Sequence, residues 1–172
     1  MRHDEAHDAQ NGPDDSCYSC EALRGERHIS PGQRIFEGKW WVVEHAWPTS
    51  VVGWGVLVLR RHAGALHELA ADELTEMGTL LARVVRALHA ETDCAKEYLA
   101  CFAEAEHFQH VHLHVAPRAT GLPQELQELQ GPRIFALLNQ ADGSQASVAD
   151  VQAFCGRLAA AMDADESSLD SQ

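Results

Sequence analysis

Short apolar runs alternate with two longer amphipathic segments along this chain, a pattern that predicts an α+β fold. Five runs read as strands, at residues 34–37, 40–44, 54–59, 97–102 and 110–116. Gly38 separates the first two, which predicts a hairpin. The short link between the last two favours antiparallel pairing, and Pro117 is expected to end the final strand.

Two segments have the spacing of amphipathic helices. The first places apolar residues on one face at Leu74, Met77, Leu80, Leu81, Val84, Val85 and Leu88, and Asp72 is its expected N-cap. The second runs from a cap at Ser147 to Met162, with its apolar face formed by Val148, Val151, Phe154, Cys155, Leu158 and Met162. Residues 123–130 suggest one or two helical turns, and residues 132–138 are ambiguous between strand and helix.

The ends of the chain differ from the middle in composition. Residues 1–16 and 163–172 are polar and lack apolar periodicity, so we expect both to be disordered tails. Hydrophobic residues make up 45% of the 172-residue chain, which is enough for one core. The sequence therefore predicts a single domain over residues 17–162, with a helical extension at its C-terminal end.

Charge and cysteine content narrow the class of protein. A net charge of −13 argues against sequence-independent binding to nucleic acid, although Arg60, Arg61 and Arg118 could form a local pocket for a small anion. No apolar run reaches the roughly 18 residues of a membrane span, and the polar N-terminus does not resemble a signal peptide. Five cysteines, an odd number, fit a secreted disulfide framework poorly. We therefore expect a soluble cytoplasmic protein.

The run HVHLHVAPR, residues 110–118, carries the chemistry of this sequence. Residues at every second position of a strand share a face, so His110, His112 and His114 line one side while the intervening Val and Leu residues enter the core. Two functional interpretations follow from the residues alone. Two or three rings could bind a metal, or one imidazole could be a nucleophile flanked by rings that orient it and bind an anion.

The same run resembles the signature of the histidine triad superfamily, H-φ-H-φ-H-φ-φ with φ apolar, at all seven positions. The resemblance covers roughly residues 17–118. It includes CYSC at residues 17–20 and the segment GWGVLVLRRH at residues 53–62, which resembles the strand before the family's long helix. The later segment LPQELQELQGPRIFALL resembles the C-terminal extension of some bacterial members.

This resemblance implies a small α+β domain built around a five-stranded antiparallel sheet, often a homodimer. It also implies an enzyme that hydrolyses or transfers the nucleoside monophosphate group of dinucleoside polyphosphates or nucleoside phosphoramidates. By position, His112 would attack the α-phosphorus of an AMP-containing substrate, and His114 would donate a hydrogen bond to the phosphate oxygens. The carbonyl of His110 would accept the proton on the far nitrogen of His112 and so fix its tautomer.

Zinc-bearing members of the family hold a structural metal ion with two cysteines and two histidines. Carried over to this chain, the ligands are Cys17, Cys20, His62 and His110, a closed set that suits tetrahedral zinc.

The chain departs from the family where the substrate is bound. Ala46 stands where many members carry an Asp for the ribose, and Glu44 is the nearest substitute. The stretch before the triad, residues 105–109, lacks the family's hydroxyl residue, which leaves His107 and Gln109, with Arg118 after the triad, as candidate substrate contacts. Trp47 is the best candidate for stacking on a base.

Two alternatives to the nucleotidyl hydrolase or transferase stay open at this point. The altered loop before the triad motivates a non-catalytic nucleotide-binding protein that kept the fold. A mononuclear metal hydrolase would instead use the triad histidines as its ligands.

Overall fold

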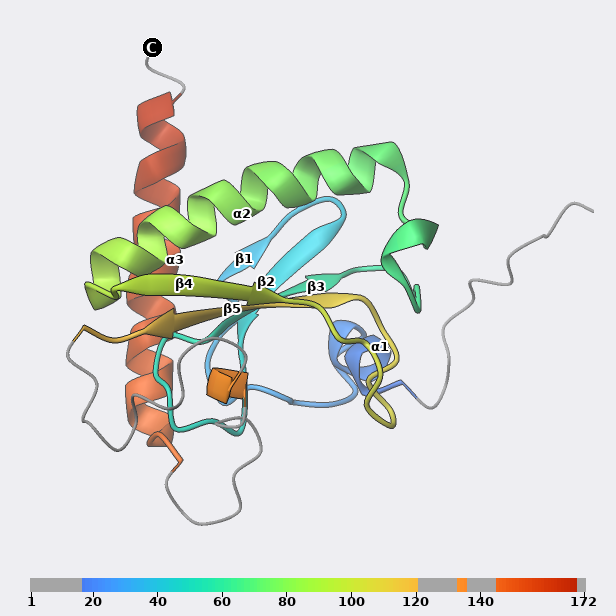
Figure 1. Cartoon of the computed structure of the whole chain (residues 1–172), viewed down its shortest axis with the longest axis horizontal. Helices are drawn as coiled ribbons and strands as arrows, with labels where there is room; N and C mark the ends of the chain where they lie inside the picture. The colour runs from blue at the N-terminus through green and yellow to red at the C-terminus, as the bar shows by residue number, and fades with distance from the viewer. Residues whose placement is uncertain (1–16, 121–132, 136–144, 170–172) are drawn as a thin grey trace, which may run out of the picture.

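A computed structural model describes residues 17–120, 133–135 and 145–169 of the chain (Figure 1). Its strands are β1 (Phe36–Glu37), β2 (Trp41–His45), β3 (Gly55–Leu59), β4 (Lys96–Ala100) and β5 (His112–Arg118). Its α-helices are α1 (Tyr18–Leu23), α2 (Ala71–Thr92) and α3 (Val148–Leu169), and a short 3-10 helix, η1, covers Leu66–Glu68. The expectation of an α+β fold is confirmed.

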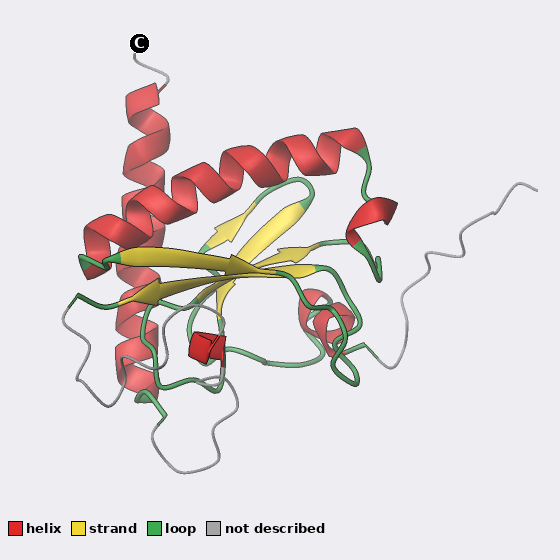
Figure 2. Ribbon diagram, in the orientation of Figure 1, coloured by secondary structure: helices red, strands yellow, loops and turns green. Residues whose placement is uncertain are grey.

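All five strands form one antiparallel sheet in the order β1-β2-β3-β5-β4 (Figure 2). The predicted hairpin around Gly38 is present as β1 and β2, with Phe36 paired to Val43. The strand β5 pairs with β3 on one side and β4 on the other, so Val58 lies opposite His112 and Ala100 lies opposite His114. The triad strand is therefore an interior strand of the sheet.

The two faces of the sheet are covered differently. On one face, α2 and α3 pack over alternate strand residues, and the core there includes Trp41, Val43, Leu57, Leu59, Leu113, Val115, Leu80, Val84, Leu88, Phe154, Leu158 and Met162. On the other face, a smaller cluster contains Val42, Ala46, Trp54, Val56, Val58, Ala116 and Ile134. The helix α1 and residues 133–135 lie on this second side of the sheet (Figure 1).

The long helix α2 begins earlier in the sequence than was predicted. Its N-cap is Ala70, so the prediction of Asp72 as the cap is wrong. The Glu73 carboxylate accepts the backbone N–H of Ala70 at 2.8 Å and also pairs with the Arg61 guanidinium at 2.7 Å. A carboxylate reaching back from the first turn satisfies the free N–H at this end and removes the need for a polar cap.

The strand β5 does not end before Pro117, as was predicted. Pro117 pairs with Glu97, and Arg118 pairs with Lys96. The pairing of β5 with β3 ends at Val115, so beyond that point the strand has a neighbour on one side only. A sheet tolerates proline where one side of the strand has no ladder to complete.

The last helix starts as predicted and extends further. The Ser147 hydroxyl accepts the backbone N–H of Asp150 at 3.1 Å, and Val151, Phe154, Cys155, Leu158 and Met162 are buried. Val148 is 47% exposed and does not belong to the buried face. The helix continues to Leu169, into the segment that was expected to be a disordered tail. Residues 1–16 and 123–130, and most of 132–138, lie outside the described residues.

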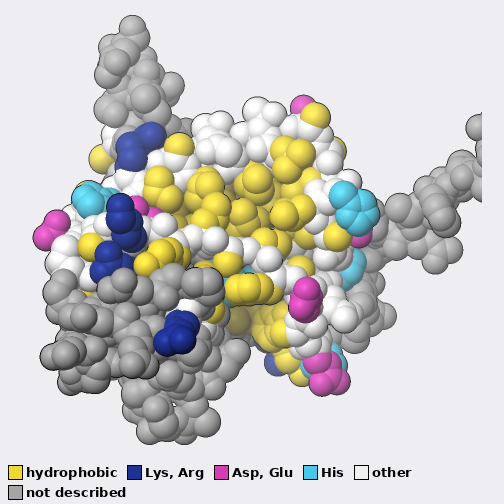
Figure 3. All heavy atoms as spheres, viewed as in Figure 1, with side chains coloured by type: hydrophobic (Ala, Val, Ile, Leu, Met, Phe, Trp, Pro, Cys, Tyr) yellow, Lys and Arg dark blue, Asp and Glu magenta, His cyan; other side chains and the backbone are white. Residues whose placement is uncertain are grey.

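Hydrophobic side chains gather over the middle of the face shown in Figure 3, where α2 and β4 lie in Figure 1. Leu74 on α2 is 42% exposed and Leu99 on the edge strand β4 is 50% exposed. Within the described residues, no helix combines the length and the apolarity that crossing a membrane requires.

Candidate functional site

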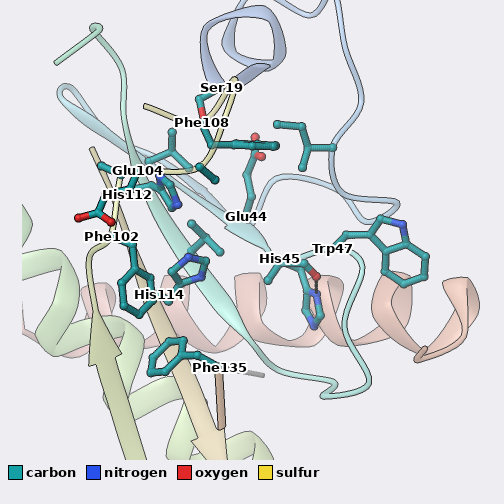
Figure 4. A pocket seen from close by; sticks show the side chains of 16 residues that line it. Ser19, Glu44, His45, Trp47, Phe102, Glu104, Phe108, His112, His114 and Phe135 are labelled. Carbon is teal, nitrogen blue, oxygen red and sulfur yellow. Dashed lines mark hydrogen bonds between the residues drawn. The ribbon is translucent and has the colours of Figure 1, made fainter. Parts of the chain in front are cut away.

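A cavity of about 310 Å³ opens on the face of the sheet that α2 and α3 leave free (Figure 4). Its floor is formed by alternate residues of β3 and β5, namely Val56, Val58, His112 and His114. Its walls include Ser19 of α1, residues 44–47 at the end of β2 and just beyond it, residues 102–105 after β4, Phe108 and Phe135. Three separate loops and α1 therefore converge on two of the triad histidines.

His112 is held by a single short hydrogen bond. Its Nδ1 lies 2.6 Å from the backbone oxygen of His110, so Nδ1 carries the proton and donates it to that carbonyl. The opposite nitrogen, Nε2, is then the one with a free electron pair. Burial lowers the pKa of His112, which keeps the ring neutral near pH 7. A neutral, oriented imidazole at a cavity wall has the properties of a nucleophile.

His114 lies beside His112, with 5.0 Å between the ring centroids. The rings of Trp54, Phe102 and Phe135 surround it, each with its centroid 6.0 to 6.1 Å from that of His114. Phe102 and Phe135 also contact each other, with 5.2 Å between their centroids. Burial in these apolar surroundings, with a smaller contribution from His112, lowers the pKa of His114 to about 4. His114 is therefore a neutral ring near pH 7, and its ring faces the same cavity as His112 (Figure 4).

His110 points away from the cavity, although it belongs to the same sequence run. Its Nε2–H donates to the backbone oxygen of Leu59 at 2.7 Å, which leaves Nδ1 free to accept. That Nδ1 lies 3.5 Å from both Cys17 Sγ and Cys20 Sγ. His110 is 0% exposed and lies in the bend that precedes β5, so the prediction that it shares one side of the strand with His112 and His114 is wrong.

Cys17, Cys20, His62 and His110 form a compact group in which one ligand atom from each lies within 4.8 Å of the others. A third contact, beside the two that His110 makes, joins Cys20 Sγ and His62 Nδ1 at 3.4 Å. Zinc bond lengths of 2.0–2.3 Å in a tetrahedron place neighbouring nitrogen and sulfur ligands about 3.6 Å apart. The spacing and the donor types therefore fit zinc, and the hydrogen bond from His110 to Leu59 orients the ring from behind.

Neither His112 nor His114 belongs to a metal-binding group within the part of the chain that the structure describes. The geometry gives no support to a metal ion held by all three triad rings, because His110 faces the cysteines and His112 donates to a carbonyl.

The other predicted site residues fall into two sets. Glu44 lines the cavity and accepts a hydrogen bond from Arg34 Nε at 2.9 Å, and Trp47 also lines it. Arg118 lies at the end of β5 outside the cavity lining, and Gln109 is exposed on the loop before the triad. His107 stacks on Tyr18 with 4.6 Å between centroids, so it connects this loop to α1 instead of lining the cavity.

The cavity lacks the basic residues that the sequence suggested. Arg61 pairs with Glu73 and Arg60 donates to the Gly38 carbonyl at 3.2 Å, and neither arginine lines the cavity. Among the described residues that line the cavity, none is lysine or arginine, and two are the carboxylates Glu44 and Glu104. The electrostatic character of this cavity is therefore acidic to neutral.

Sequence reasoning overlooked His45, which is 2% exposed at the end of β2. Its Nδ1–H donates to the Ala46 carbonyl at 2.6 Å, and its Nε2 accepts the backbone N–H of Gly53 at 2.9 Å. Both nitrogens are thus satisfied in the neutral form, and burial lowers the pKa of the ring. His45 fixes the loop from residue 46 to residue 53 that carries Trp47, and its position next to Glu44 was the available signal.

Comparison with known proteins gives matches among solved structures. No protein-family model matches the chain, and no curated protein sequence matches it. A zinc-bound histidine triad family protein from Mycobacterium smegmatis is 19% identical with a TM-score of 0.64, covering 89% of this chain and 97% of that one.

Two further structures agree with this match. A hypothetical histidine triad nucleotide-binding protein from Sulfolobus tokodaii is 12% identical with a TM-score of 0.65, covering 86% of this chain and 92% of that one. A histidine triad protein from Bradyrhizobium japonicum is 22% identical with a TM-score of 0.61, covering 76% and 90%. This chain, with its five-stranded antiparallel sheet and with residues 112–116 of the seven-residue signature on the interior strand β5, therefore has the histidine triad fold.

Proposed function

We propose that the protein is a nucleotidyl hydrolase or transferase that acts at the α-phosphate of an AMP-containing substrate through His112. The observation that supports this most is the hydrogen bond of 2.6 Å from His112 Nδ1 to the His110 carbonyl, on a ring that lines a cavity. That bond presents a deprotonated Nε2 to whatever occupies the cavity.

The reaction proceeds in two displacements. Nε2 of His112 forms a bond to the α-phosphorus, the bond from phosphorus to the leaving group breaks, and the leaving group takes a proton from solvent. His114 donates a hydrogen bond to the phosphate oxygens, where it stabilises the developing charge. Water then displaces the histidine from phosphorus, releasing AMP and a proton and restoring the neutral ring.

The charge of the cavity favours one substrate class over the other. A dinucleoside polyphosphate brings several negative charges, and a carboxylate in the wall opposes them. Glu104 lines the cavity and lies beside His112 in Figure 4, whereas the charge of Glu44, which also lines the cavity, is balanced by its ion pair with Arg34. A nucleoside phosphoramidate has a single phosphorus and releases an amine, which a carboxylate accommodates. We therefore propose phosphoramidates ahead of dinucleoside polyphosphates.

The test combines turnover with identification of the modified residue. The protein is incubated separately with adenosine phosphoramidate and diadenosine tetraphosphate, then quenched in acid-free denaturant and analysed by mass spectrometry. We expect AMP release, faster from the phosphoramidate, and an adenylyl group on His112. Adenylylation of another residue, or AMP release that persists in His112→Asn, would overturn the proposal.

A non-catalytic nucleotide-binding protein is the second candidate. The loop from Ala105 to Gln109 carries no hydroxyl side chain, and its His107 is occupied by stacking on Tyr18. In this alternative, AMP binds tightly to the wild-type chain while neither nucleotide is turned over.

We propose that zinc is a structural cofactor held by Cys17, Cys20, His62 and His110. When bound, the ion supplies a cross-link between α1 and the strand ends, and the four residues hold it without an open position. All five cysteines are free thiols in the structure, which fits a reducing compartment and supports a cytoplasmic location.

We also propose that the protein is a homodimer joined along β4. This strand is an edge of the sheet, and its Leu99 is 50% exposed. Hydrophobic side chains gather on the face where β4 and α2 lie (Figure 3). An exposed edge strand with apolar residues pairs readily with a second copy. Light scattering after size exclusion is expected to give a dimer for the wild type and a monomer for Leu99→Glu, and a monomeric wild type would contradict this.

A further inference from the structure

We propose that His89, Cys94 and Glu97 form a second site for a divalent metal ion, separate from the Cys17 group. These residues lie where α2 ends and β4 begins, at the left of the sheet in Figure 1. The imidazole nitrogen, the thiol and a carboxylate oxygen all lie within 4.8 Å of one another. The nucleotide-binding cavity does not include any of the three residues.

The distances within this group are close to those between the ligands of one ion. His89 Nδ1 lies 3.0 Å from Glu97 Oε1, Cys94 Sγ lies 3.2 Å from the same oxygen, and Cys94 Sγ lies 3.8 Å from His89 Nδ1. Tetrahedral zinc with bonds of 2.0–2.3 Å separates its ligands by about 3.3–3.8 Å. Shifts of a few tenths of an ångström would bring all three atoms into coordination.

The backbone explains why these residues meet. His89 is on the last turn of α2, and Asp93 ends the helix in the left-handed region at φ 46, with its N–H bonded to the His89 carbonyl at 2.9 Å. This reversal turns Cys94 back toward the helix, where it is 2% exposed, and starts β4 with Glu97 on the same side. The group is therefore positioned by a helix end and a strand start, and both belong to the packed fold.

The donor set selects the kind of ion. A thiolate and a carboxylate together carry two negative charges, which a divalent cation neutralises. With the neutral imidazole they form a ligand set that combines a soft sulfur donor with harder nitrogen and oxygen donors. Thiolate disfavours Mg²⁺ and Ca²⁺, so zinc is the expected ion. The side chain of His89 is 58% exposed, so one coordination position faces solvent and is open to water or an external ligand. The C-terminal end of α2 adds a favourable dipole for a cation.

Without an ion, the same atoms form a hydrogen-bonded group. The Cys94 thiol donates to Glu97 Oε1, and His89 Nδ1 lies within hydrogen-bond distance of that oxygen. These are the protons that metal binding would displace, so binding at this site releases protons and weakens as the pH falls.

The test is a Zn²⁺ titration of the metal-free full-length chain by calorimetry, with bound zinc counted by mass spectrometry. The double variant Cys17→Ala/Cys20→Ala disables the first group, and we expect it to retain one tight equivalent of zinc. Adding His89→Gln should weaken that remaining binding at least about tenfold, since it removes a ligand. His67→Gln changes another exposed histidine and serves as the matched control, which should retain the equivalent.

Either of two outcomes overturns the proposal. In the first, the double variant binds no zinc tightly; in the second, His89→Gln and Glu97→Gln both leave the remaining zinc binding unchanged. Because His89 and Glu97 are partly exposed, these variants are expected to fold, and thermal melts establish this. Cobalt provides a second readout: a thiolate-to-metal absorption band in the double variant should disappear when Cys94→Ala is added. The result does not depend on turnover, so it stands apart from the proposed activity.

Discussion

The two sides of β5 have different neighbours and different uses. Leu113 and Val115 point into the hydrophobic core under α2 and α3, whereas His112 and His114 point into the cavity on the opposite face. Because side chains alternate along a strand, one seven-residue element contributes to both without sharing a side chain between them. Along this part of β5, the odd-numbered residues contribute to the core and the even-numbered histidines line the cavity.

The two faces also differ in what holds their covering elements. Two helices of 22 residues cover the core face and are fixed by extensive burial of Phe154, Leu158 and other apolar side chains. The six-residue α1 on the cavity face is too short to be stable alone. The buried Cys17 at its N-cap and Cys20 within it contact His110 and His62, so on this face a Cys–His group takes the place of a large apolar interface.

The largest expected effect is that of His112→Asn, which should lower turnover and leave stability almost unchanged. Removal of the proposed nucleophile should lower turnover by about 10⁴-fold or more. The free energy of unfolding should change by less than about 1 kcal/mol, since the ring lies at a cavity and outside the core. Initial rates with adenosine phosphoramidate and urea unfolding of the same preparation measure both quantities. A large fall in the free energy of unfolding together with the fall in rate would contradict the view that the two sides of β5 act independently.

The largest effect on stability is expected at the Cys–His group. Cys17→Ala, or zinc removal with a chelator, should lower the free energy of unfolding by about 3–5 kcal/mol, because ion binding is coupled to folding of α1. Thermal melts with and without chelator measure this. The chelator should have a smaller effect on Cys17→Ala than on the wild type, and equal effects would show that the stabilising ion binds elsewhere.

A substitution on the core side of β5 should have the opposite effect to His112→Asn, lowering stability and leaving the rate nearly unchanged. Leu113→Ala leaves a cavity under the helices and should lower the free energy of unfolding by about 2–5 kcal/mol. At a temperature where the variant is still folded, its rate per folded molecule should stay within about threefold of the wild type. Urea unfolding and initial rates again test the pair, and a kcat that falls far more than the folded fraction would show that the faces are coupled.

The smallest effect is expected from the Glu73–Arg61 pair at the start of α2. The hydrogen bond from Arg61 holds the pKa of Glu73 below its ordinary value. A lowered pKa in the folded state means that the pair stabilises the protein above the unfolded pKa, and that this contribution is lost as the pH falls through the folded pKa. Glu73→Gln should therefore cost about 1–3 kcal/mol near pH 7 and less near pH 3. Urea unfolding at both values tests this, and an equal cost at both would contradict it.

Much of the fold was predictable because it depends on local periodicity. The alternation of β5 and the helical spacing of α2 and α3 each follow from a repeat visible in the sequence, and the observed elements match them. The Cys–His group was reached by resemblance, and the structure brings all four residues together. The predicted end at Pro117 and the predicted cap at Asp72 were wrong because each depended on neighbours from distant segments, β3 in one instance and Arg61 in the other.

The walls of the cavity were less predictable than its floor. The loop between β4 and β5 contains two residues with positive φ, Ala103 at 50° and His107 at 64°, and neither is a glycine that would signal such a conformation. These turns direct His107 onto Tyr18 and leave Glu104 at the cavity. The position of the Glu104 carboxylate at the cavity, on which the proposed substrate preference depends, is set by this loop and could not be predicted from residue spacing.

His110 makes its ring and its backbone serve different neighbours at once. The ring is anchored among two sulfurs and the Leu59 carbonyl, while the backbone oxygen of the same residue orients His112. Replacing this residue would disturb anchoring and orientation together, so a dead variant at position 110 cannot be interpreted as evidence for either role. The two roles of His110 are therefore tested separately through its partners: the cysteines that contact its ring, and His112, which donates a hydrogen bond to its backbone oxygen.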